Sequence, residues 1–481
     1  MSAAAQRSVS GLNEETATQR KDHRTSEIGE LKARDNFTNI RFIAFVYAVL
    51  IASVGGTIWS YTLVAEAGLP WWYNMPATML AVVVNGAVQH QFGGIIHEGT
   101  HYTLFANRKL NELVSDWLAA FPIYTSTYAF RLHHFSHHQF VNDPERDSNF
   151  AQAKDSGHWL DFPLTHMELL AAIFRQLNPI RLASYILARA RYSALGVDSN
   201  PYADSEHRGS PWFIRIGVLY AAGVPAVVIP LINRERWDLA IAFLSISWVA
   251  TIAYYWFAPE KHIPKNRLDP VISERATALS RISFMALLYS ALTFGQYVSQ
   301  APFWHYFGLL WILPLFTTFP LFMILREWVQ HGNADRGRYT NTRVFLAGPF
   351  VRYAVFPWGM DYHLPHHMYA TVPHYNLPEL HRFLLQYPEY AKEALVVENY
   401  MVPKQRRPKR NPTVLEVVGP EYARRNTEVY IDNSVLDAWD VDEREEILRQ
   451  GELSVGANGQ PNGSASPSSA GSQSADKAVA V

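Results

Sequence analysis

The sequence of 481 residues contains no cysteine. This absence excludes a disulfide framework, a thiolate nucleophile and any iron–sulfur or zinc centre bound by cysteine in this chain. Charged side chains are scarce as well, at 18% of the residues, and 42 basic residues nearly balance 43 acidic ones. A net charge of -1 argues against a nucleic-acid-binding protein. Any metal chemistry must therefore rely on histidine and carboxylate ligands.

The apolar residues, which make up 48% of the chain, gather into long runs. A run of about 20 such residues spans the roughly 30 Å hydrocarbon core of a bilayer. The expected crossings comprise residues 43–64, 72–96, 212–232, 237–258, 282–298 and 303–325. The sequence therefore predicts an all-α polytopic membrane protein with about six hydrophobic crossings, and not a single soluble domain.

The distribution of Lys and Arg predicts the orientation in the membrane. Residues 97–211 and 259–281 and the chain after Arg326 are rich in both, whereas the turns at 65–71 and 299–302 have neither. The positive-inside rule then places the long polar segments in the cytoplasm. The turn with Arg234 and Arg236 is an exception, which weakens the prediction of the third crossing.

The domain organisation follows from the same patterns. Residues 1–40 lack the apolar core of a signal peptide and are expected to form a cytoplasmic arm. Residues 41–400 are expected to form the membrane-embedded domain. Residues 401–450, first basic and then acidic, are expected in the cytoplasm, and residues 451–481 are expected to be disordered.

Two further stretches favour positions at the membrane boundary. Residues 159–192 alternate apolar residues with arginines, which is typical of helices lying on a membrane surface, with a break at Pro179. Residues 117–130 are apolar but too short to span, so a re-entrant or interfacial segment is expected.

Histidine is abundant, with 19 residues, and three clusters contain eight of the candidate ligands. The three boxes are His97-Glu-Gly-Thr-His101, His133-His134-Phe-Ser-His137-His138 and His363-Leu-Pro-His366-His367. His97 and His101 are four residues apart and would share one helix face. His134, His137 and His138 are three and four residues apart and would likewise share one face. Pro365 suits the first turn of a helix, so the third box is expected to begin on a loop and continue into a helix.

The number of histidines predicts more than one metal. A single zinc takes about four ligands, of which a catalytic site takes three from the protein. Eight or nine imidazole nitrogens instead indicate two metal ions. His133 lies outside the helical face of its box and is interpreted as structural. The solitary histidines are interpreted as packing or capping residues: His90, His158, His166, His207, His262, His305, His374 and His381.

The boxes, in this order, resemble those of the membrane-bound fatty acid desaturase and hydroxylase superfamily. The segment Asn142-Asp143-Pro144-Glu145-Arg146-Asp147 and the sequence HLPHHMYATVPHYNLPELH add to the resemblance, which covers roughly residues 40–385. It implies a non-haem di-iron centre, held almost wholly by histidines under a cytoplasmic helical cap. It also implies activation of O2 and attack on an unactivated C–H bond of a lipid or fatty acyl chain.

The resemblance also maps the metal ligands onto this sequence. The family's ligands correspond to His97, His101, His134, His137, His138, His363, His366 and His367. Members often carry an extra ligand after the last crossing, and His331 matches by position; the alternative is a helix-end histidine near the C-terminal dipole. Glu327, one turn earlier, could face the metals or orient a ligand.

Two other classes of protein compete with this interpretation. His97-Glu98-Gly-Thr-His101 matches the HExxH signature of zinc metalloproteases, in which the glutamate is the general base. A metalloprotease would, however, have no use for the histidines of the second and third boxes. A transporter would place ionisable residues along a pore, and the six crossings contain few of them.

The resemblance is compatible with several reactions on a lipid chain and implies external partners. Desaturation is favoured by analogy, and hydroxylation, carotenoid ketolation or terminal-alkene formation are alternatives on the same scaffold. The sequence contains no Gly-rich dinucleotide-binding turn and no HPGG-type haem motif. Electrons must therefore come from an external donor, expected to be a ferredoxin-like carrier with its reductase. The basic run 404–410 would dock that carrier or bind anionic membrane lipids.

Overall fold

The computed structural model describes residues 26–195, 200–204, 206–401, 411–422 and 429–432. Helices dominate these residues, and the two strands described, β1 (Val344–Leu346) and β2 (Val396–Glu398), form a small parallel pair. The all-α prediction is therefore confirmed. The predictions for the arm before residue 26, for the basic run 404–410 and for the tail 451–481 concern residues outside the described ranges.

Six helical segments are long and apolar enough to cross a membrane. Four are single helices: α2 (Thr38–Glu66), α9 (Pro211–Ile232), α10 (Trp237–Phe257) and α11 (Glu274–Ser299). The second crossing joins η1 (Trp71–Asn74) to α3 (Met75–Thr100). The sixth consists of α12 (Phe303–Phe307), η5 (Gly308–Ile312), α13 (Leu313–Phe316) and α14 (Thr318–Gln330). The prediction of six crossings is confirmed, including the third.

One boundary differs from the sequence-based expectation. The fifth helix was expected to begin at residue 282, but α11 begins at Glu274, after the N-cap Ser273. Its first two turns are polar, so a search for apolar runs does not detect them. The Ser273 hydroxyl accepts from the backbone N of Ala276, which stabilises the earlier start.

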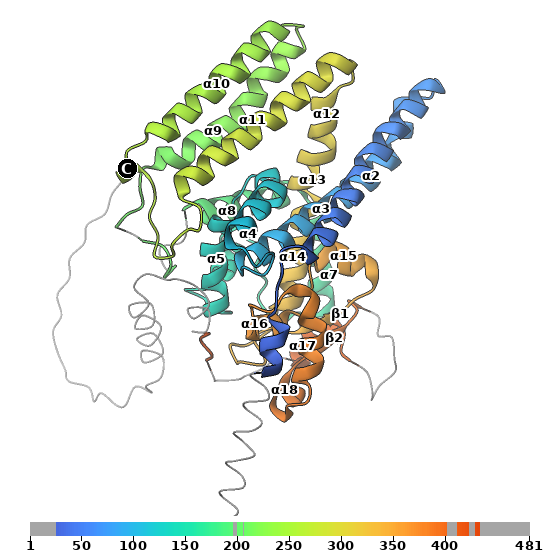
Figure 1. Ribbon diagram of the computed structural model, residues 1–481. Coiled ribbons are helices and arrows are strands. Elements are labelled where there is room, and N and C mark those ends of the chain that lie inside the picture. The colour runs from blue at the N-terminus through green and yellow to red at the C-terminus, as the bar shows by residue number, and fades with distance from the viewer. Residues whose placement is uncertain (1–25, 196–199, 205, 402–410, 423–428, 433–481) are drawn as a thin grey trace, which may run out of the picture.

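The crossings differ in how much of them is buried by protein. In their most apolar windows α2 and α10 are each 17% buried, whereas the second crossing is 67% buried and the sixth is 50% buried. The second and sixth crossings therefore form the centre of the molecule. Figure 1 shows α2, α9, α10 and α11 extending toward one end, with the short helices of the cap at the opposite end.

Short helices after α3 build the first part of the cap. They are α4 (Arg108–Ser115), η2 (Asp116–Ala120), η3 (Phe121–Ile123), α5 (Thr127–Gln139), α6 (Ser148–Asp155), α7 (His166–Gln176) and α8 (Pro179–Leu195). Side chains cap several N-termini, including Asn107 before α4, Ser126 before α5 and Asp147 before α6. The predicted break at Pro179 is confirmed, because this residue begins α8.

The rest of the cap follows the sixth crossing. After β1 come α15 (Pro349–Val355), α16 (His363–Met368), η6 (His374–Asn376), α17 (Leu377–Leu384) and α18 (Pro388–Glu393), then β2, α19 (Val414–Val417) and η7 (Pro420–Tyr422). The turn η4 (Glu260–His262) lies between α10 and α11. Val344 pairs with Val396 and Leu346 with Glu398, which ties the segment before α16 to the segment after α18.

Candidate metal centre

Each histidine box lies on or at the end of a helix. His97 lies in the last turn of α3 and His101 is its C-cap. The second box belongs to α5. Pro365 lies in the first turn of α16 as expected, but the third box does not begin on a loop, because His363 is already the first residue of this helix. His331 is the C-cap residue of α14. Four separate helices therefore direct histidines toward the junction between the crossings and the cap.

The structure brings all nine predicted ligands together in two groups. The first cluster consists of His97, His101, His134, His138 and His366, and the second cluster consists of His137, His331, His363 and His367. Within each cluster the candidate ligand atoms lie within 4.8 Å of one another. All nine side chains are buried, with at most 4% of their surface exposed. The two groups are what a pair of metal ions would require.

The distances between ring nitrogens fit metal ligation. Nε2 of His101 lies 3.0 Å from Nε2 of His134, and Nε2 of His363 lies 3.0 Å from Nε2 of both His331 and His367. Two nitrogens that each lie about 2.1 Å from one ion, about 90° apart, are about 3.0 Å from each other. Nε2 of His97 is buried and has no hydrogen-bond partner among the described residues. The donor set therefore fits an ion in each cluster.

The cluster imidazoles are held in the neutral form that binds metals. Burial, followed by the neighbouring His137, lowers the pKa of His366 to about 3. Burial and adjacent histidines also lower the pKa of His134 and His138 well below the ordinary range. The pKa values of His363 and His367 are lowered for the same reasons.

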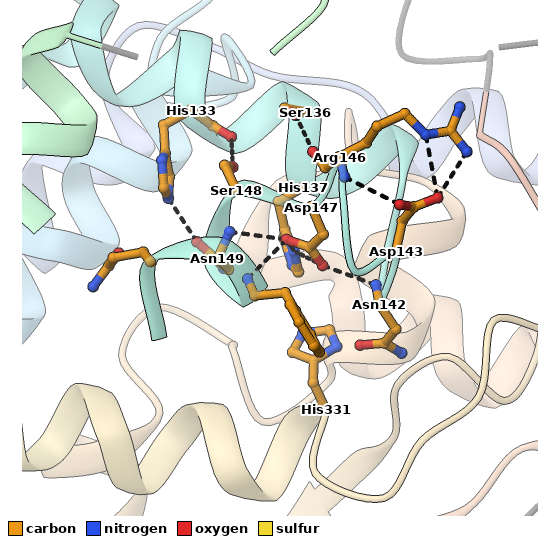
Figure 2. A network of polar contacts seen from close by, with 12 residues as sticks. His133, Ser136, His137, Asn142, Asp143, Arg146, Asp147, Ser148, Asn149 and His331 are labelled. Atoms are coloured by element: carbon orange, nitrogen blue, oxygen red, sulfur yellow. Dashed lines mark hydrogen bonds and ion pairs between the residues drawn. The ribbon is translucent and has the colours of Figure 1, made fainter. Parts of the chain in front are cut away.

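His137 differs from the other cluster members because a carboxylate supports it. Its Nδ1 lies 2.9 Å from Oδ1 of Asp147, and Figure 2 shows this pair beside His331. Burial by itself would lower the pKa of His137, but the charges of Asp147 and Glu327 outweigh burial and raise it. A carboxylate on the far nitrogen fixes the tautomer and orientation of a ligating ring. Nε2 of His137 is thereby left to face the second cluster.

Asp147 is itself held rigidly by the turn after α5. Its carboxylate accepts hydrogen bonds from the backbone N of Asn142 at 2.8 Å and of Asn149 at 2.9 Å. Asp143, in the same turn, pairs with Arg146 at 2.7 Å and with Arg336 at 2.5 Å. Figure 2 shows Asp147 beside His137, with the Asp143–Arg146 pair in the same turn. The segment 142–147 therefore forms the support of the second cluster.

The other end of the site is supported by residues that the sequence did not single out. Arg131 of α5 is fully buried and pairs with Glu112 of α4. Its guanidinium donates to backbone carbonyls at the end of α3. Asp116 accepts from the backbone N of Thr127 at 2.7 Å, at the start of α5. No spacing rule identifies such residues, because their partners lie in other segments and include backbone groups.

The remaining described histidines stay out of both clusters, as expected. His133 contacts Oδ1 of Asn149 through Nε2 at 2.8 Å. His90 contacts the carbonyl of Ala354 at 2.9 Å, and His381 contacts the Tyr390 hydroxyl at 2.7 Å. The others of this group are His158, His166, His207, His262, His305 and His374.

The two acidic residues beside the boxes are not members of the clusters. Oε2 of Glu98 accepts from the Thr103 hydroxyl at 3.0 Å and from the backbone N of His374 at 3.1 Å. These bonds link the first box to the segment after the third box. A metalloprotease base would need a free carboxylate facing the metal, so this geometry argues against the protease interpretation. The charge of Glu327 contributes to the raised pKa of His137.

A pocket of about 290 Å³ reaches the second cluster. His331, Asn142, Trp159 and Phe162 are among the residues that line it. Because His331 is part of its lining, this pocket adjoins the second cluster.

Comparisons with known proteins agree with this architecture. The sequence profile of the family described as fatty acid desaturase matches residues 70–257 and 228–397. These residues include the three boxes and His331. A relative, the dihydrorhizobitoxine desaturase of Bradyrhizobium elkanii, is 24% identical over 421 residues, which are 86% of this chain and 91% of that protein. The chain belongs to the fatty acid desaturase family.

Proposed function

We propose that this membrane oxidoreductase is an O2-dependent fatty acid desaturase with two non-haem iron ions, one in each histidine cluster. The observation that carries the proposal is the convergence of nine buried histidines into groups of five and four. Imidazole ligands suit iron, and the chain offers no sulfur ligand from cysteine. Family membership supports a desaturase-like oxidoreductase, and the bacterial relative is also named a desaturase.

The ions, when bound, would supply the activation of O2 and the removal of hydrogen from a methylene group. Converting a –CH2–CH2– unit to –CH=CH– removes two hydrogen atoms, and reduction of O2 to two waters consumes these with two further electrons and two protons. No electron-carrying group of its own is recognisable in the sequence, so we infer a ferredoxin-like carrier and its reductase as partners.

The protein's own contribution is to position the ligands and exclude water. The nine imidazoles come from four helices and are almost completely buried, so their geometry is set before an ion binds. Asp147 holds the proton at Nδ1 of His137 and so directs Nε2 to the second cluster. An alkyl chain has no polar group near the reacting carbon, so apolar walls must fix its position.

Hydroxylation is the second candidate on this scaffold, with carotenoid ketolation and terminal-alkene formation behind it. The same histidine set would serve desaturation and hydroxylation, because the branch depends on whether a second hydrogen or a hydroxyl group is transferred. We favour desaturation on the family match alone. We further propose that the cap and the clusters face the cytoplasm, following the distribution of Lys and Arg.

Metal analysis of the detergent-purified protein tests the proposal first. We expect about two irons per chain, and new double bonds in the lipids of expressing cells. His134→Ala, His138→Ala and His367→Ala should each lower bound iron and abolish activity, because each removes a cluster nitrogen. His158→Ala, whose ring contacts Ser156, is the control and should do neither. One zinc and no iron in the wild-type protein would refute the di-iron proposal, and new hydroxyl groups instead of double bonds would favour the hydroxylase.

A further inference from the structure

Arg131 is a fully buried cation on the helix that bears the second histidine box. Its side chain has no exposed surface. Nε donates to the carbonyl oxygen of Thr100 at 3.0 Å, and Nη2 donates to that of Gly99 at 2.9 Å. These carbonyls lie between His97 and His101 in the chain. One guanidinium therefore joins the end of the first box directly to the helix of the second box.

Neighbouring side chains fix the orientation of this guanidinium. Glu112 of α4, 3% exposed, is its ion-pair partner. Asn111 donates through Nδ2 to the same Gly99 carbonyl at 2.8 Å. The ring of Tyr102 lies under the guanidinium, with its centroid 4.2 Å from Cζ of Arg131. The cation is thus held by an acid of α4 and by two carbonyls and an aromatic ring at the end of α3.

The backbone around this bridge leaves little room for displacement. A Cβ added at Gly99 would lie 2.4 Å from Oγ of Ser115, which real Cβ atoms do not approach. Oγ of Ser115 lies 2.7 Å from Oγ1 of Thr127 at the start of α5. The end of α3, the end of α4 and the start of α5 are therefore in direct contact.

A buried ion pair contributes little net stability, since apolar residues of similar size often replace it without loss. The planar guanidinium of Arg131 does fix geometry, because its N–H donors must meet the carbonyl oxygens of Thr100 and Gly99 in one orientation. We propose that Arg131 is a positioning residue for the first cluster: its bridge to the end of α3 sets the 3.0 Å separation between Nε2 of His101 and Nε2 of His134. This inference rests on the proposed metal-binding function.

Cobalt titration of the metal-stripped, full-length protein in detergent tests the proposal. The visible absorption of bound Co2+ reports its coordination geometry separately from catalysis. We expect Arg131→Met combined with Glu112→Met to lower Co2+ affinity at the first cluster about 10- to 100-fold. The spectrum of the second cluster and the thermal unfolding of the metal-free protein should stay near those of the wild type. Arg131→Lys keeps a cation but not the fork, so it should restore only part of the affinity.

Tyr128→Phe is the matched control on the same helix. It removes a buried hydroxyl that donates to the Leu268 carbonyl at 2.5 Å, a bond that does not join the two boxes. We expect this variant to bind Co2+ at both clusters as the wild type does.

Three results would overturn the inference. The first is a double variant that binds Co2+ at the first cluster with the wild-type affinity and spectrum. The second is the same result for Arg131→Lys, if the double variant does not fold. The third is a Tyr128→Phe variant that loses as much Co2+ affinity as the double variant. A wild-type protein that binds no Co2+ would instead refute the metal site on which the inference rests.

Discussion

Asp116 is a buried carboxyl group that belongs to neither metal cluster. It lies at the start of η2 with 4% of its surface exposed, and its Oδ1 accepts the backbone N–H of Thr127 at 2.7 Å. Burial raises the pKa of Asp116 from 3.8 to about 6, against the opposing effect of this hydrogen bond. The charged form therefore costs free energy in the folded protein at neutral pH.

Asp116→Asn should stabilise the protein above pH 6 and have little effect near pH 4. Between these values the folded state binds more protons than the unfolded state, so this group's contribution to stability falls as the pH rises through 4 to 6. A shift of about two units corresponds to at most about 3 kcal/mol. The asparagine oxygen can still accept from Thr127. Thermal unfolding in detergent at several pH values measures the difference, and an equal difference at every pH would contradict the assignment.

At the residue scale, spacing and the family resemblance singled out nine histidines that the structure brings together, but little of what supports them. His97, His134 and His363 could be chosen because histidines three or four apart share a helix face. Asp116 and Arg131 carry no such signal, since their partners lie in other segments and include backbone groups. Only the fold brings these groups together.

At the element scale, one glycine decides how closely α3 and α14 pack. A Cβ at Gly86 would lie 2.0 Å from Oγ1 of Thr318 and 2.9 Å from the backbone N of Phe319. The Thr318 hydroxyl donates to the carbonyl of Val82 on α3 at 2.6 Å. These two helices end in the first box and in His331. Their separation therefore affects the relative position of the clusters.

Gly86→Ala should destabilise the protein by about 1 to 3 kcal/mol or more, because the added methyl group forces the helices apart. Iron bound by the purified variant should fall at the same time. Gly93→Ala is the control in the same helix, since the nearest atom to its Cβ would be Cδ2 of His90 at 3.8 Å. Alanine there should be neutral or stabilising by up to about 1 kcal/mol. Equal thermal unfolding of both variants would show that Gly86 has no packing role.

The helices α7 and α8 expose large apolar side chains outside the six crossings. Phe174 is 69% exposed and Ile180 is 78% exposed, although α8 also packs against α5 and α14. Arg175 and Arg191 lie on exposed positions of the same pair of helices. Apolar and basic residues together are typical of a helix pair in the headgroup region of a membrane.

Spin labels on single cysteines test this position, because the chain has no cysteine of its own. In liposomes, labels at Phe174→Cys and Ile180→Cys should collide more with O2 than with a water-soluble nickel chelate. Lys392→Cys on α18 is the control and should show the opposite preference. Collision ratios at the first two sites equal to those at the control would place α7 and α8 in water.

Element boundaries show where the sequence was informative and where it was not. Apolar runs located six crossings, but they missed the polar start of α11 and the breaks of the sixth crossing near Pro314 and Thr317. An apolar run indicates only that a segment avoids water, whether in lipid or in protein. It does not detect a polar helical turn such as the capped start of α11. Prolines mark possible breaks without showing which of them the neighbouring helices accommodate.

At the scale of the whole molecule, the clusters lie between a buried pair of crossings and a cap built from distant parts of the chain. The second and sixth crossings are the most enclosed, and each ends beside a cluster. The box order could be read from the sequence, but the division of nine histidines into five and four could not. That division depends on α16, far along the chain, which contributes His366 to the first cluster and His363 and His367 to the second.

The orientation of the whole molecule is the last prediction. Six crossings would place residues 26–37 and the cap after α14 on one side, and the turn between α2 and η1 on the other. That turn has no Lys or Arg, whereas the cap is rich in both, so the cap should face the cytoplasm. Leu69 in this turn is 43% exposed. In intact spheroplasts, a membrane-impermeant maleimide should therefore label Leu69→Cys. Lys392→Cys in the cap should react only after permeabilisation. Because the chain lacks other thiols, labelling of Lys392→Cys in intact spheroplasts would mean that the cap faces outward and that its electron donor must be sought on that side.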